Sequence, residues 1–492
     1  MKAHGGPCRW FEALSTGSKR SDDAGMPPPA TKIWPPAAAM KRLTVLAGPI
    51  LLLLLSLSFF LFRPTSPPIL SSLQAFEPDR RLRVYVADLP RALNYGLLDR
   101  YWSLSAADSR IPSSSDPDHP APHNHPHYPE SPLIKQYSAE YWLLTSLHTA
   151  ATAAVRVVAD WREADVVFVP FFATLSAEME LGWGTKGAFR KKDGNEDYRR
   201  QLEVVDRVTA HPAWRRSGGR DHIFVLTDPV AMWHVRTEIA PAILLVVDFG
   251  GWFKLDSKIT STNSSHMIQH TQVSLLKDVI VPYTHLLPTL LLSENKDRPT
   301  LLYFKGAKHR HRGGLVREKL WDLLGNEPDI IMEEGFPDAT GRDQSIKGMR
   351  ASEFCLHPAG DTPTSCRLFD AIASLCIPVI VSDEVELPFE GMIDYTEFSI
   401  FVSVSNAMKP KWLTNYLRNI SKQHKDEFRR NLAHVQPIFE YDTSYSSSRA
   451  PDGAVNYIWK KIHQKLPMIQ EAIIREKRKP DGTSIPLRCH CT

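Results

Sequence analysis

The sequence predicts an α/β protein with two successive doubly wound units, preceded by one membrane-spanning helix. Short apolar runs alternate with helical stretches along the chain, and this pattern is typical of parallel strands that are covered on both faces. A polar connection that ends in proline, residues 295–299, separates two series of such runs. A single long apolar segment lies near the start of the chain.

The first series of apolar runs begins at residue 82. It comprises strands predicted at 82–89 (LRVYVADL), 166–172 (VVFVPFF), 222–227 (HIFVLT) and 243–248 (ILLVVD), with an amphipathic helix at 137–149. The second series comprises strands at 300–304, 329–332, 352–356 and 377–382, with helices at 315–324 and from about 365. Branched and aromatic residues dominate the strand segments, as expected for buried strands.

The apolar segment 43–62 contains 20 residues without a charge. About 20 helical residues cross the hydrocarbon core of a membrane. Lys41 and Arg42 precede the segment directly, and Arg63 is the one basic residue in the 15 that follow it. The positive-inside rule therefore predicts a cytosolic N-terminus, with residues 63–492 across the membrane. A cleaved signal peptide would have a shorter start and a shorter apolar run, so we expect an uncleaved signal-anchor.

The predicted segments follow from these boundaries and from composition. They are a disordered cytosolic tail (1–42), the anchor (43–62), a stem (63–80), an N-terminal Rossmann-like domain (81–295), a C-terminal Rossmann-like domain (296–475) and a C-terminal tail (476–492). Hydrophobic residues make up 43% of the chain and charged residues 23%, which is ordinary for a globular protein. The formal net charge of +4 gives no reason to expect nucleic acid as a partner.

The cysteines fit an oxidising compartment. Cys8 would be cytosolic, and five cysteines follow the anchor: Cys355, Cys366, Cys376, Cys489 and Cys491. Because five is odd, at least one thiol stays free or pairs with another chain, and the pairing is left open. Asn263 and Asn419 begin glycosylation sequons, which function only on the luminal side.

Residues 349–389 form the densest group of functional signals. The strand at 352–356 leads into a loop rich in proline and glycine, and Ser365 is then placed to cap the next helix. The N-terminus of a helix offers free N–H groups to a phosphate, and Arg367 in the first turn can add charge-assisted bonds. Asp370 lies one turn further, where a carboxylate can accept from ribose hydroxyls.

Two charged segments flank this helix. Three carboxylates, Asp383, Glu384 and Glu386, follow the strand at 377–382 and either bind sugar hydroxyls or form a solvated turn. The basic segment 305–314 includes Lys305, Arg310 and Arg312, and Arg317 follows on the next helix. Such a cluster of cations suits an anionic ligand; the alternative is a solvated basic loop.

The segment resembles the C-terminal half of exostosin-type glycosyltransferases, whose signature appears here as four motifs in order. They are Ser352-Glu353-Phe354-Cys355-Leu356-His357-Pro358-Ala359-Gly360, Ser365-Cys366-Arg367-Leu368-Phe369-Asp370-Ala371, Pro378-Val379 and Glu386-Leu387-Pro388-Phe389. The segments 164–172 and 219–222 resemble the family's A-D-x-F-x-V-P-F and G-R-D-H motifs. Residues 277–283 and 358–363 resemble the plant Golgi branch that contains arabinosyltransferases of pectin.

The resemblance implies an inverting GT-B enzyme, in which two Rossmann-like domains face one another. It makes 81–295 the acceptor-side domain and 296–475 the nucleotide-sugar-binding domain. It implies a UDP-sugar donor, a cell-wall polysaccharide acceptor and a type II Golgi membrane topology with a luminal catalytic domain, and we expect no metal or other cofactor. The sugar would be arabinose or another pentose or hexose. The candidate donor-binding residues are Lys305, Arg310, Arg312, Arg317, His357, Ser365, Arg367, Asp370, Glu384 and Glu386.

An inverting transfer needs a base that deprotonates the acceptor hydroxyl. In a GT-B enzyme the base comes from the N-terminal domain, near a strand exit that faces the cleft. Asp228 follows the strand at 222–227 and Asp248 ends the strand segment 243–248, so both fit this position. Asp228 is the favoured candidate and Asp248 the second. His222 is the weaker third, because it begins a strand.

Two other interpretations were weighed against this one. The fold without the chemistry would suit a non-catalytic scaffold in a Golgi complex, and homo- or hetero-oligomers with other glycosyltransferases fit either interpretation. Asp116-Pro117-Asp118 has the form of a metal-binding D-x-D, but it lies in a loop rich in serine and proline with no strand before it. The irregularly spaced His119, His123, His125 and His127 favour an acceptor-side or solvated loop over a zinc site.

Overall fold

The structure is a computed structural model. It describes residues 81–107, 126–149, 153–181, 191–248, 250–253, 267–269, 274–309, 316–335, 339–360, 362–383, 385–441 and 453–478. The predicted anchor at 43–62 lies outside this set. None of the helices in these ranges combines the length and the apolar composition that a membrane crossing requires.

The first sheet has six parallel strands. They are β1 (Leu82–Val86), β2 (Val155–Val157), β3 (Val166–Phe168), β4 (His222–Leu226), β5 (Ile243–Val246) and β8 (Val279–Ile280), in the order β2-β1-β3-β4-β5-β8. Every residue of β3, β4 and β5 is buried, as expected for strands with helices on both faces. The chain passes from β2 across β1 to β3, so the direction of winding reverses between β1 and β3.

The second sheet repeats this topology with five parallel strands. They are β9 (Thr300–Lys305), β10 (Ile330–Glu333), β11 (Ser352–Pro358), β12 (Ile377–Val381) and β13 (Ile400–Val402), in the order β10-β9-β11-β12-β13. The reversal here falls between β9 and β11. Two further strands, β6 (Gly250–Phe253) and β7 (Met267–Gln269), form a small antiparallel pair. The predicted α/β class with two parallel sheets is confirmed.

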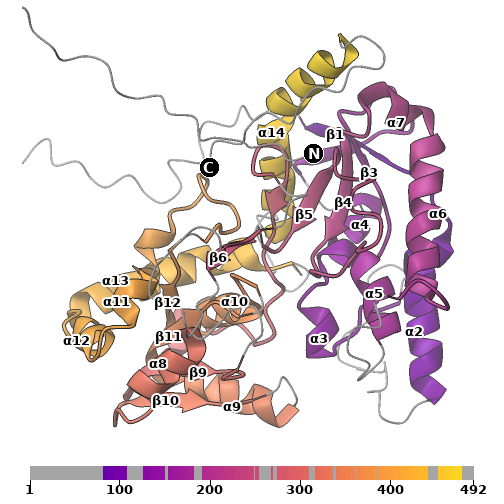
Figure 1. Ribbon diagram of the computed structural model, residues 1–492. Coiled ribbons are helices and arrows are strands. Elements are labelled where there is room, and N and C mark those ends of the chain that lie inside the picture. Colours follow the sequence, from indigo (N-terminus) through magenta and orange to yellow (C-terminus); the bar gives the residue numbers. More distant parts are fainter. Residues whose placement is uncertain are drawn as a thin grey trace, which may run out of the picture. The chain divides into compact units, whose positions relative to one another are not determined.

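Helices connect the strands and cover the sheets (Figure 1). The α-helices are α2 (Tyr95–Ala107), α3 (Pro132–Lys135), α4 (Ala139–His148), α5 (Ala173–Leu181), α6 (Glu196–Ala210), α7 (Pro212–Ser217), α8 (Val316–Leu324), α9 (Ala339–Arg350), α10 (Cys366–Ala373), α11 (Val404–Ala407), α12 (Trp412–Arg418), α13 (Lys422–Val435) and α14 (Ala454–Lys477). Short 3₁₀ turns are η2 (Arg91–Leu93), η7 (Leu292–Glu294), η8 (Tyr395–Glu397) and η9 (Gln436–Phe439).

Two predicted strands are too long by three or more residues: β1 ends at Val86, within the predicted 82–89, and β3 ends well before residue 172. The segment 166–172 was expected to be extended throughout, but β3 ends at Phe168. Pro170 has no N–H to donate to a neighbouring strand, so the ladder stops before it and α5 begins at Ala173. The short run Phe171–Phe172 is instead buried in the core between the strand and the helix.

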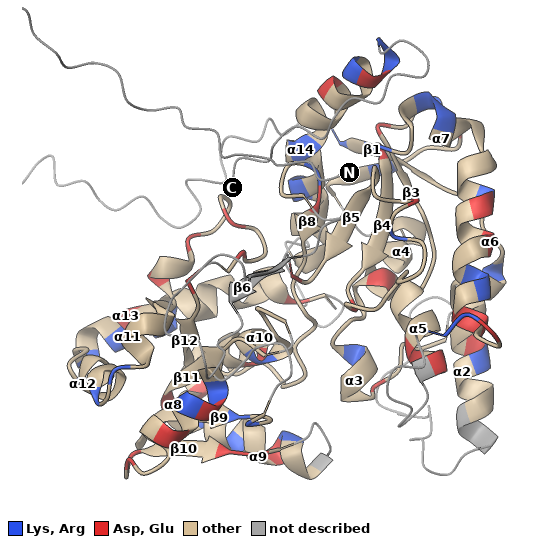
Figure 2. Cartoon of the chain, in the orientation of Figure 1, with Lys and Arg blue, Asp and Glu red and all other residues tan. Residues whose placement is uncertain are grey.

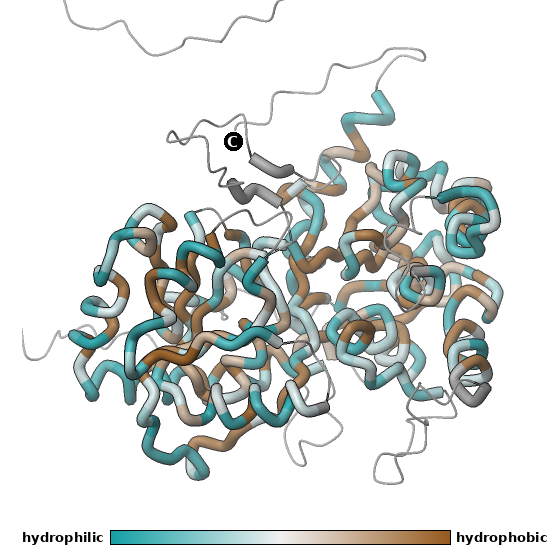
Figure 3. The backbone as a smooth tube through the Cα atoms, turned by 60° about the horizontal axis from the view of Figure 1, so that its bottom comes forward, coloured by the Kyte–Doolittle hydropathy of each residue, from teal (hydrophilic) through white to brown (hydrophobic). Residues whose placement is uncertain are grey.

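Charge and hydropathy separate the strands from the helices that face solvent. Figure 2 shows β4 and β5 free of charged residues, while α6 carries both signs along its length. In Figure 3 the brown, hydrophobic segments lie inside each half and the teal ones on peripheral helices. The burial of apolar strand residues between helices is the dominant stabilising term in folds of this kind.

Candidate active site

The reversal between β9 and β11 places two strand ends and two loops together. In sheets of this order, ligands bind outside the carboxyl ends of the strands at the point of reversal. β9 ends at Lys305 and β11 at Pro358, and the two strands are paired along Ser352–Cys355. The loop after β11 leads to the N-terminus of α10, so the residues of the predicted donor site converge at this edge.

A pocket of about 840 Å³ opens at this edge. Five predicted donor-binding residues line it: Lys305, Arg317, Ser365, Arg367 and Asp370. Its opposite wall comes from the segment that includes α3 and from Tyr283. Further lining residues include Glu130, Lys135, Tyr137, Pro229, Leu286, Leu287, Arg342, Gly360, Thr362 and Thr364.

Two arginines hold fixed positions in the pocket. Arg317 of α8 is buried, and its Nε and Nη2 donate to the carbonyls of Ala359 and Pro358 at 3.1 and 3.3 Å. The Nε of Arg367 in α10 donates to the carbonyl of Lys305 at 2.7 Å. Both guanidinium groups also lie near the ring of Phe304, at 5.4 and 6.0 Å from its centre. The backbone of β9 and β11 therefore orients both cations.

Two glycines allow the arginines to approach the backbone so closely. A Cβ atom at Gly360 would lie 2.4 Å from the Nη2 of Arg317. A Cβ atom at Gly306 would lie 2.9 Å from the Nη2 of Arg367. Contacts this short do not occur between real atoms, so any larger residue at either position would displace a guanidinium group.

Lys305 is the third cation of the pocket and, like Arg317, it is buried. Its Nζ lies 3.4 Å from a carboxylate oxygen of Glu333 and also donates to the side-chain oxygen of Gln344. The carboxylate neutralises part of its charge. Lys305 therefore contributes a weaker field to a bound anion than the two arginines do.

Ser365 and Asp370 occupy the predicted helix, with one difference in contacts. Ser365 is the N-cap residue of α10, as predicted, but its Oγ lies 3.5 Å from Nη1 of Arg367 and caps no backbone N–H. The Oδ1 of Asp370 accepts from the backbone N–H groups of Leu286 and Leu287, at 2.6 and 3.0 Å. One carboxylate oxygen of Asp370, the residue predicted to bind ribose, thus holds the segment that follows β8. Burial raises the pKa of Asp370, and these N–H groups oppose the rise.

His357 lies inside β11 rather than on the pocket wall. It is 4% exposed, and its Nε2 has no hydrogen-bond partner within the described structure. Burial first, and then the charges of Arg317 and Arg367, lower the pKa of His357 to about 3. The imidazole is therefore neutral beside the two cations.

Glu386 also lies away from the lining residues. It is hydrogen-bonded to Glu390, and burial together with the charge of Glu386 raises the pKa of Glu390 to about 7. Lys461 of α14 donates to the carbonyl of Glu390 at 2.6 Å, so this pair of carboxyl groups lies beside α14. Arg310, Arg312, Glu384 and Asn263 fall outside the described residues. Asn419 is exposed at the end of α12.

Both favoured base candidates lie at carboxyl ends of the first sheet, as predicted. Asp228 follows β4 and is 5% exposed, its Oδ1 accepts from the N–H of Val230 at 2.7 Å, and the next residue, Pro229, lines the pocket. Asp248 follows β5, where the carbonyl of Val247 accepts from the hydroxyl of Thr364 in the donor loop.

The third base candidate lies elsewhere. His222 is at the amino end of β4, away from Asp228, and its Nδ1 lies 2.8 Å from Oδ1 of Asp221. It is 1% exposed. A structural role for His222 agrees with this position.

Sequence reasoning missed two carboxyl groups near Asp228. Glu140 of α4 is 1% exposed and Glu178 of α5 is hydrogen-bonded to Asp228. Burial raises the pKa of Glu140 to about 8 and, with the charge of Asp228, that of Glu178 to about 9. Both lie on helices, whereas the predicted base candidates, Asp228, Asp248 and His222, all lie in or next to strands. The signal available for Glu140 was a carboxylate on the apolar face of the predicted helix at 137–149.

In the part of the chain that the structure describes, we looked for side chains that could bind a metal ion together. No group of three or more histidine, cysteine, aspartate or glutamate side chains there could hold a metal ion. The D-x-D at 116–118 and three of the four loop histidines lie outside the described ranges. Of those four, only His127 is described, and its carbonyl accepts from the indole of Trp102.

Two doubly wound parallel sheets with a cation-lined pocket at a strand reversal define an α/β protein whose pocket suits an anionic ligand. Residues 78–417 match the family model described as the Exostosin GT47 domain. The chain belongs to the exostosin GT47 family and is a glycosyltransferase.

Relatives cover most of the chain. It is 35% identical to the Arabidopsis thaliana protein named "Probable arabinosyltransferase ARAD1", over 84% of each chain. It is 25% identical to "Probable glucuronosyltransferase Os01g0926600" of Oryza sativa subsp. japonica, over 80% of this chain and 83% of that one. The crystal structure of CalG4, the calicheamicin glycosyltransferase, covers 81% of this chain at 10% identity, but its TM-score of 0.26 adds no argument.

Proposed function

We propose that this glycosyltransferase transfers a sugar, arabinose or another pentose or hexose, from a UDP-sugar to a cell-wall polysaccharide with inversion. The observation that supports it most is the pair of Arg317 and Arg367, which are fixed by backbone carbonyls in a pocket of about 840 Å³. Two fixed guanidinium groups suit a diphosphate, because their positive charges stabilise its negative charge.

The chemistry requires three events in one step. The acceptor hydroxyl oxygen forms a bond to the anomeric carbon, the bond from that carbon to UDP breaks, and the hydroxyl proton passes to a base. A single displacement of this kind inverts the anomeric centre. The arginines stabilise the charge that develops on the leaving UDP, and this supports our proposal that no metal is required. Asp228 is the proposed base, because it is ionisable, follows β4 and adjoins the pocket residue Pro229.

The proposed setting is the Golgi membrane with the catalytic part in the lumen. The uncharged segment 43–62 and its basic flank support a single-pass type II topology. The disulfide between Cys355 and Cys376 supports an oxidising compartment, because cytosolic proteins rarely keep such bonds. The name of the Arabidopsis relative favours arabinose among the donors to be tested first.

The test is a titration of the full-length chain with UDP and a panel of pentose and hexose UDP-sugars. We expect Arg367→Ala to weaken UDP binding about 100-fold or more, because a guanidinium–phosphate contact in a water-poor site is worth several kcal/mol. Arg418→Ala is the matched control. Arg418 lies at the end of α12, away from the pocket, and pairs with Glu327 and Asp329.

Two results would contradict the proposal. If the wild-type chain binds no UDP-linked species, a non-catalytic scaffold in a glycosyltransferase complex explains the fold better. If transfer stops with EDTA and returns with manganese, the metal-free chemistry is wrong while the donor class stands.

A further inference from the structure

Helix α5 is attached to the end of β4 that carries Asp228. The hydroxyl of Thr174 lies 3.1 Å from that of Thr227, and the backbone N–H of Asp228 donates to the Thr174 hydroxyl at 3.3 Å. Glu178 is one turn further along α5 and therefore on the same face as Thr174. Its carboxyl group is hydrogen-bonded to the carboxyl group of Asp228. One face of α5 thus contacts both the backbone and the side chain of Asp228.

A buried network fixes the rotation of α5. The first backbone N–H groups of a helix have no partner inside the helix. Here Glu140 of α4 fills this role: its two carboxylate oxygens accept from the N–H groups of Thr174 and Leu175, at 2.9 and 3.0 Å. The hydroxyl of Tyr128 donates to Glu140 at 2.9 Å. Because α5 is held at its N-terminus in this way, Glu178 is directed at Asp228.

The hydrogen bond between the two carboxyl groups requires one proton. Two adjacent carboxylates in a dry site cannot both be ionised, so one group keeps a proton well above its usual pKa. Burial and the charge of Asp228 raise the pKa of Glu178 to about 9. Burial raises the pKa of Asp228, and the hydrogen bond from Glu178 lowers it again. The hydrogen bond thus favours the proton on Glu178 and the charge on Asp228.

We propose that Glu178 is a positioning residue for the catalytic base: its protonated carboxyl group donates to Asp228 and keeps that carboxylate ionised and oriented. The inference rests on the proposed function, in which Asp228 takes the proton of the acceptor hydroxyl. The N–H of Val230 holds one oxygen of Asp228. The donated hydrogen bond from Glu178 then fixes the plane of the carboxylate, as required of a base that must meet a hydroxyl at hydrogen-bond distance.

Other charged and titratable groups surround the pair. Those on the elements packed around it are Arg100, Tyr128, Lys135, Tyr137, Glu140, Asp197, Arg200, Arg236 and Asp248. Arg236 lowers the pKa of Asp228 and Asp248 raises it. Lys135 pairs with Glu130, and Arg200 faces Glu180 and Asp197. Arg236 and Asp248 thus act on the pKa of Asp228 in opposite directions.

The first test compares pH profiles of kcat/KM for the full-length chain and its variants. In Glu178→Leu, Asp228 loses its donor, so its pKa rises and the acid limb of the profile moves up by about one pH unit or more. At pH values on the acid limb, kcat/KM of Glu178→Leu is then about tenfold lower than that of the wild type, and it recovers at higher pH. In Glu178→Gln, the amide N–H still donates, so the acid limb stays in place while the ionisation near pH 9 disappears. Glu180→Gln on the same helix is the matched control.

The second test does not depend on activity. Infrared difference spectra across a pH titration report protonated carboxyl groups directly. We expect a carboxyl band that titrates near pH 9 in the wild type and in Glu180→Gln, and that is absent from Glu178→Gln. If this band is unchanged in Glu178→Gln, the inference is wrong. It is also wrong if Glu178→Leu lowers activity equally at every pH, since that is the result of a purely structural role. A wild-type chain that transfers no sugar would overturn the proposed function, and the infrared band would still test the carboxyl pair.

Discussion

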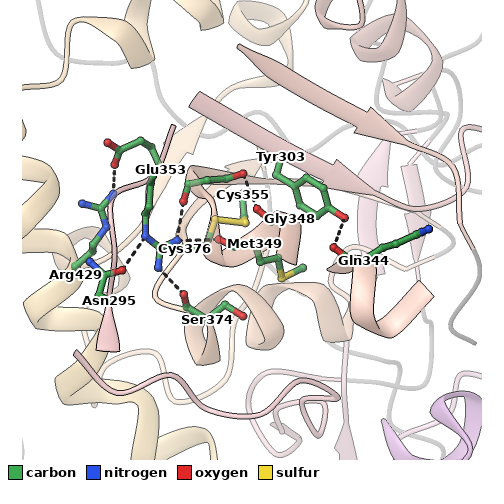
Figure 4. Close-up of a disulfide and its surroundings, with 12 residues drawn as sticks. Asn295, Tyr303, Gln344, Gly348, Met349, Glu353, Cys355, Ser374, Cys376 and Arg429 are labelled. Carbon is green, nitrogen blue, oxygen red and sulfur yellow. Dashed lines mark hydrogen bonds and ion pairs between the residues drawn. A yellow bond between two sulfur atoms is a disulfide. The ribbon is translucent and has the colours of Figure 1, made fainter. Parts of the chain in front are cut away.

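Arg298 illustrates, at the scale of one residue, how the second sheet tolerates buried charge. It is 8% exposed, and its guanidinium donates to the carbonyls of Met349, Ser352 and Ser374 at 2.7–2.8 Å. Its Nε donates to Asn295. Figure 4 shows Asn295, Met349 and Ser374 close to Cys355 and Cys376, which form a disulfide. Burial and the nearby arginines lower the pKa of Arg298 to about 9, so it is still charged at neutral pH.

We expect Arg298→Met to destabilise the protein by about 3 kcal/mol or more. The substitution fills part of the space but leaves three buried carbonyls without a donor, and an unsatisfied buried polar group costs on the order of 1–3 kcal/mol. The measurement is the free energy of unfolding in denaturant. Arg199→Met is the control, because Arg199 is exposed on α6 and its pair with Glu196 contributes little. Equal losses in the two variants would contradict this account of Arg298.

At the scale of an element, the disulfide defines a unit of strand, loop and helix. Cys355 lies in β11 and Cys376 directly precedes β12, with a sequence separation of 21. The closed loop contains the donor loop and the whole of α10. Leu287, Tyr303, Met349 and Ala371 pack around the two cysteines. Arg367 therefore lies within a covalently closed segment of the second sheet.

Replacing both cysteines by alanine should lower the free energy of unfolding by about 3 kcal/mol, since closing a loop of this size restricts the unfolded chain by roughly that amount. Denaturant unfolding of the double variant, without reductant, measures the change. Cys366→Ala is the control, because Cys366 carries no disulfide. If reductant destabilises the wild type no more than it does the double variant, the bond does not contribute as expected.

Most of the strands that the sequence predicted share one property: their apolar residues form buried runs. The strands at β1, β4, β5, β9, β11 and β12 all begin at or next to the predicted residues. The donor helix followed from Ser365 and the glycines and prolines before it. β2 has one buried residue in three, so its pattern carries no such signal. Glu178 lies in a helix whose other residues are ordinary helix formers, and only the position of α5 against β4 reveals its partner.

At the scale of the described fold, α14 contacts elements of both sheets. The ring of Trp459 lies 6.0 Å from that of Phe168 in β3, and Arg220 pairs with Glu476 at 2.9 Å. Tyr457 of the same helix lies 5.3 Å from Phe389, which follows β12. The predicted segment 296–475 therefore includes a helix that packs on the first sheet. Contacts between segments so far apart in the chain leave no local pattern in the sequence.

We expect Trp459→Ala to weaken the contact between α14 and the first sheet. Trp459 is fully buried, and replacing a buried tryptophan by alanine costs about 3–5 kcal/mol. Because α14 contacts both sheets, the loss should also reduce their cooperativity. Calorimetry should show one unfolding transition for the wild type and two, with a lower first midpoint, for the variant. Trp412→Ala is the control, since Trp412 is only half-buried and stacks on Tyr416 within α12. A single transition with an unchanged midpoint in Trp459→Ala would show that the two sheets are coupled by other contacts.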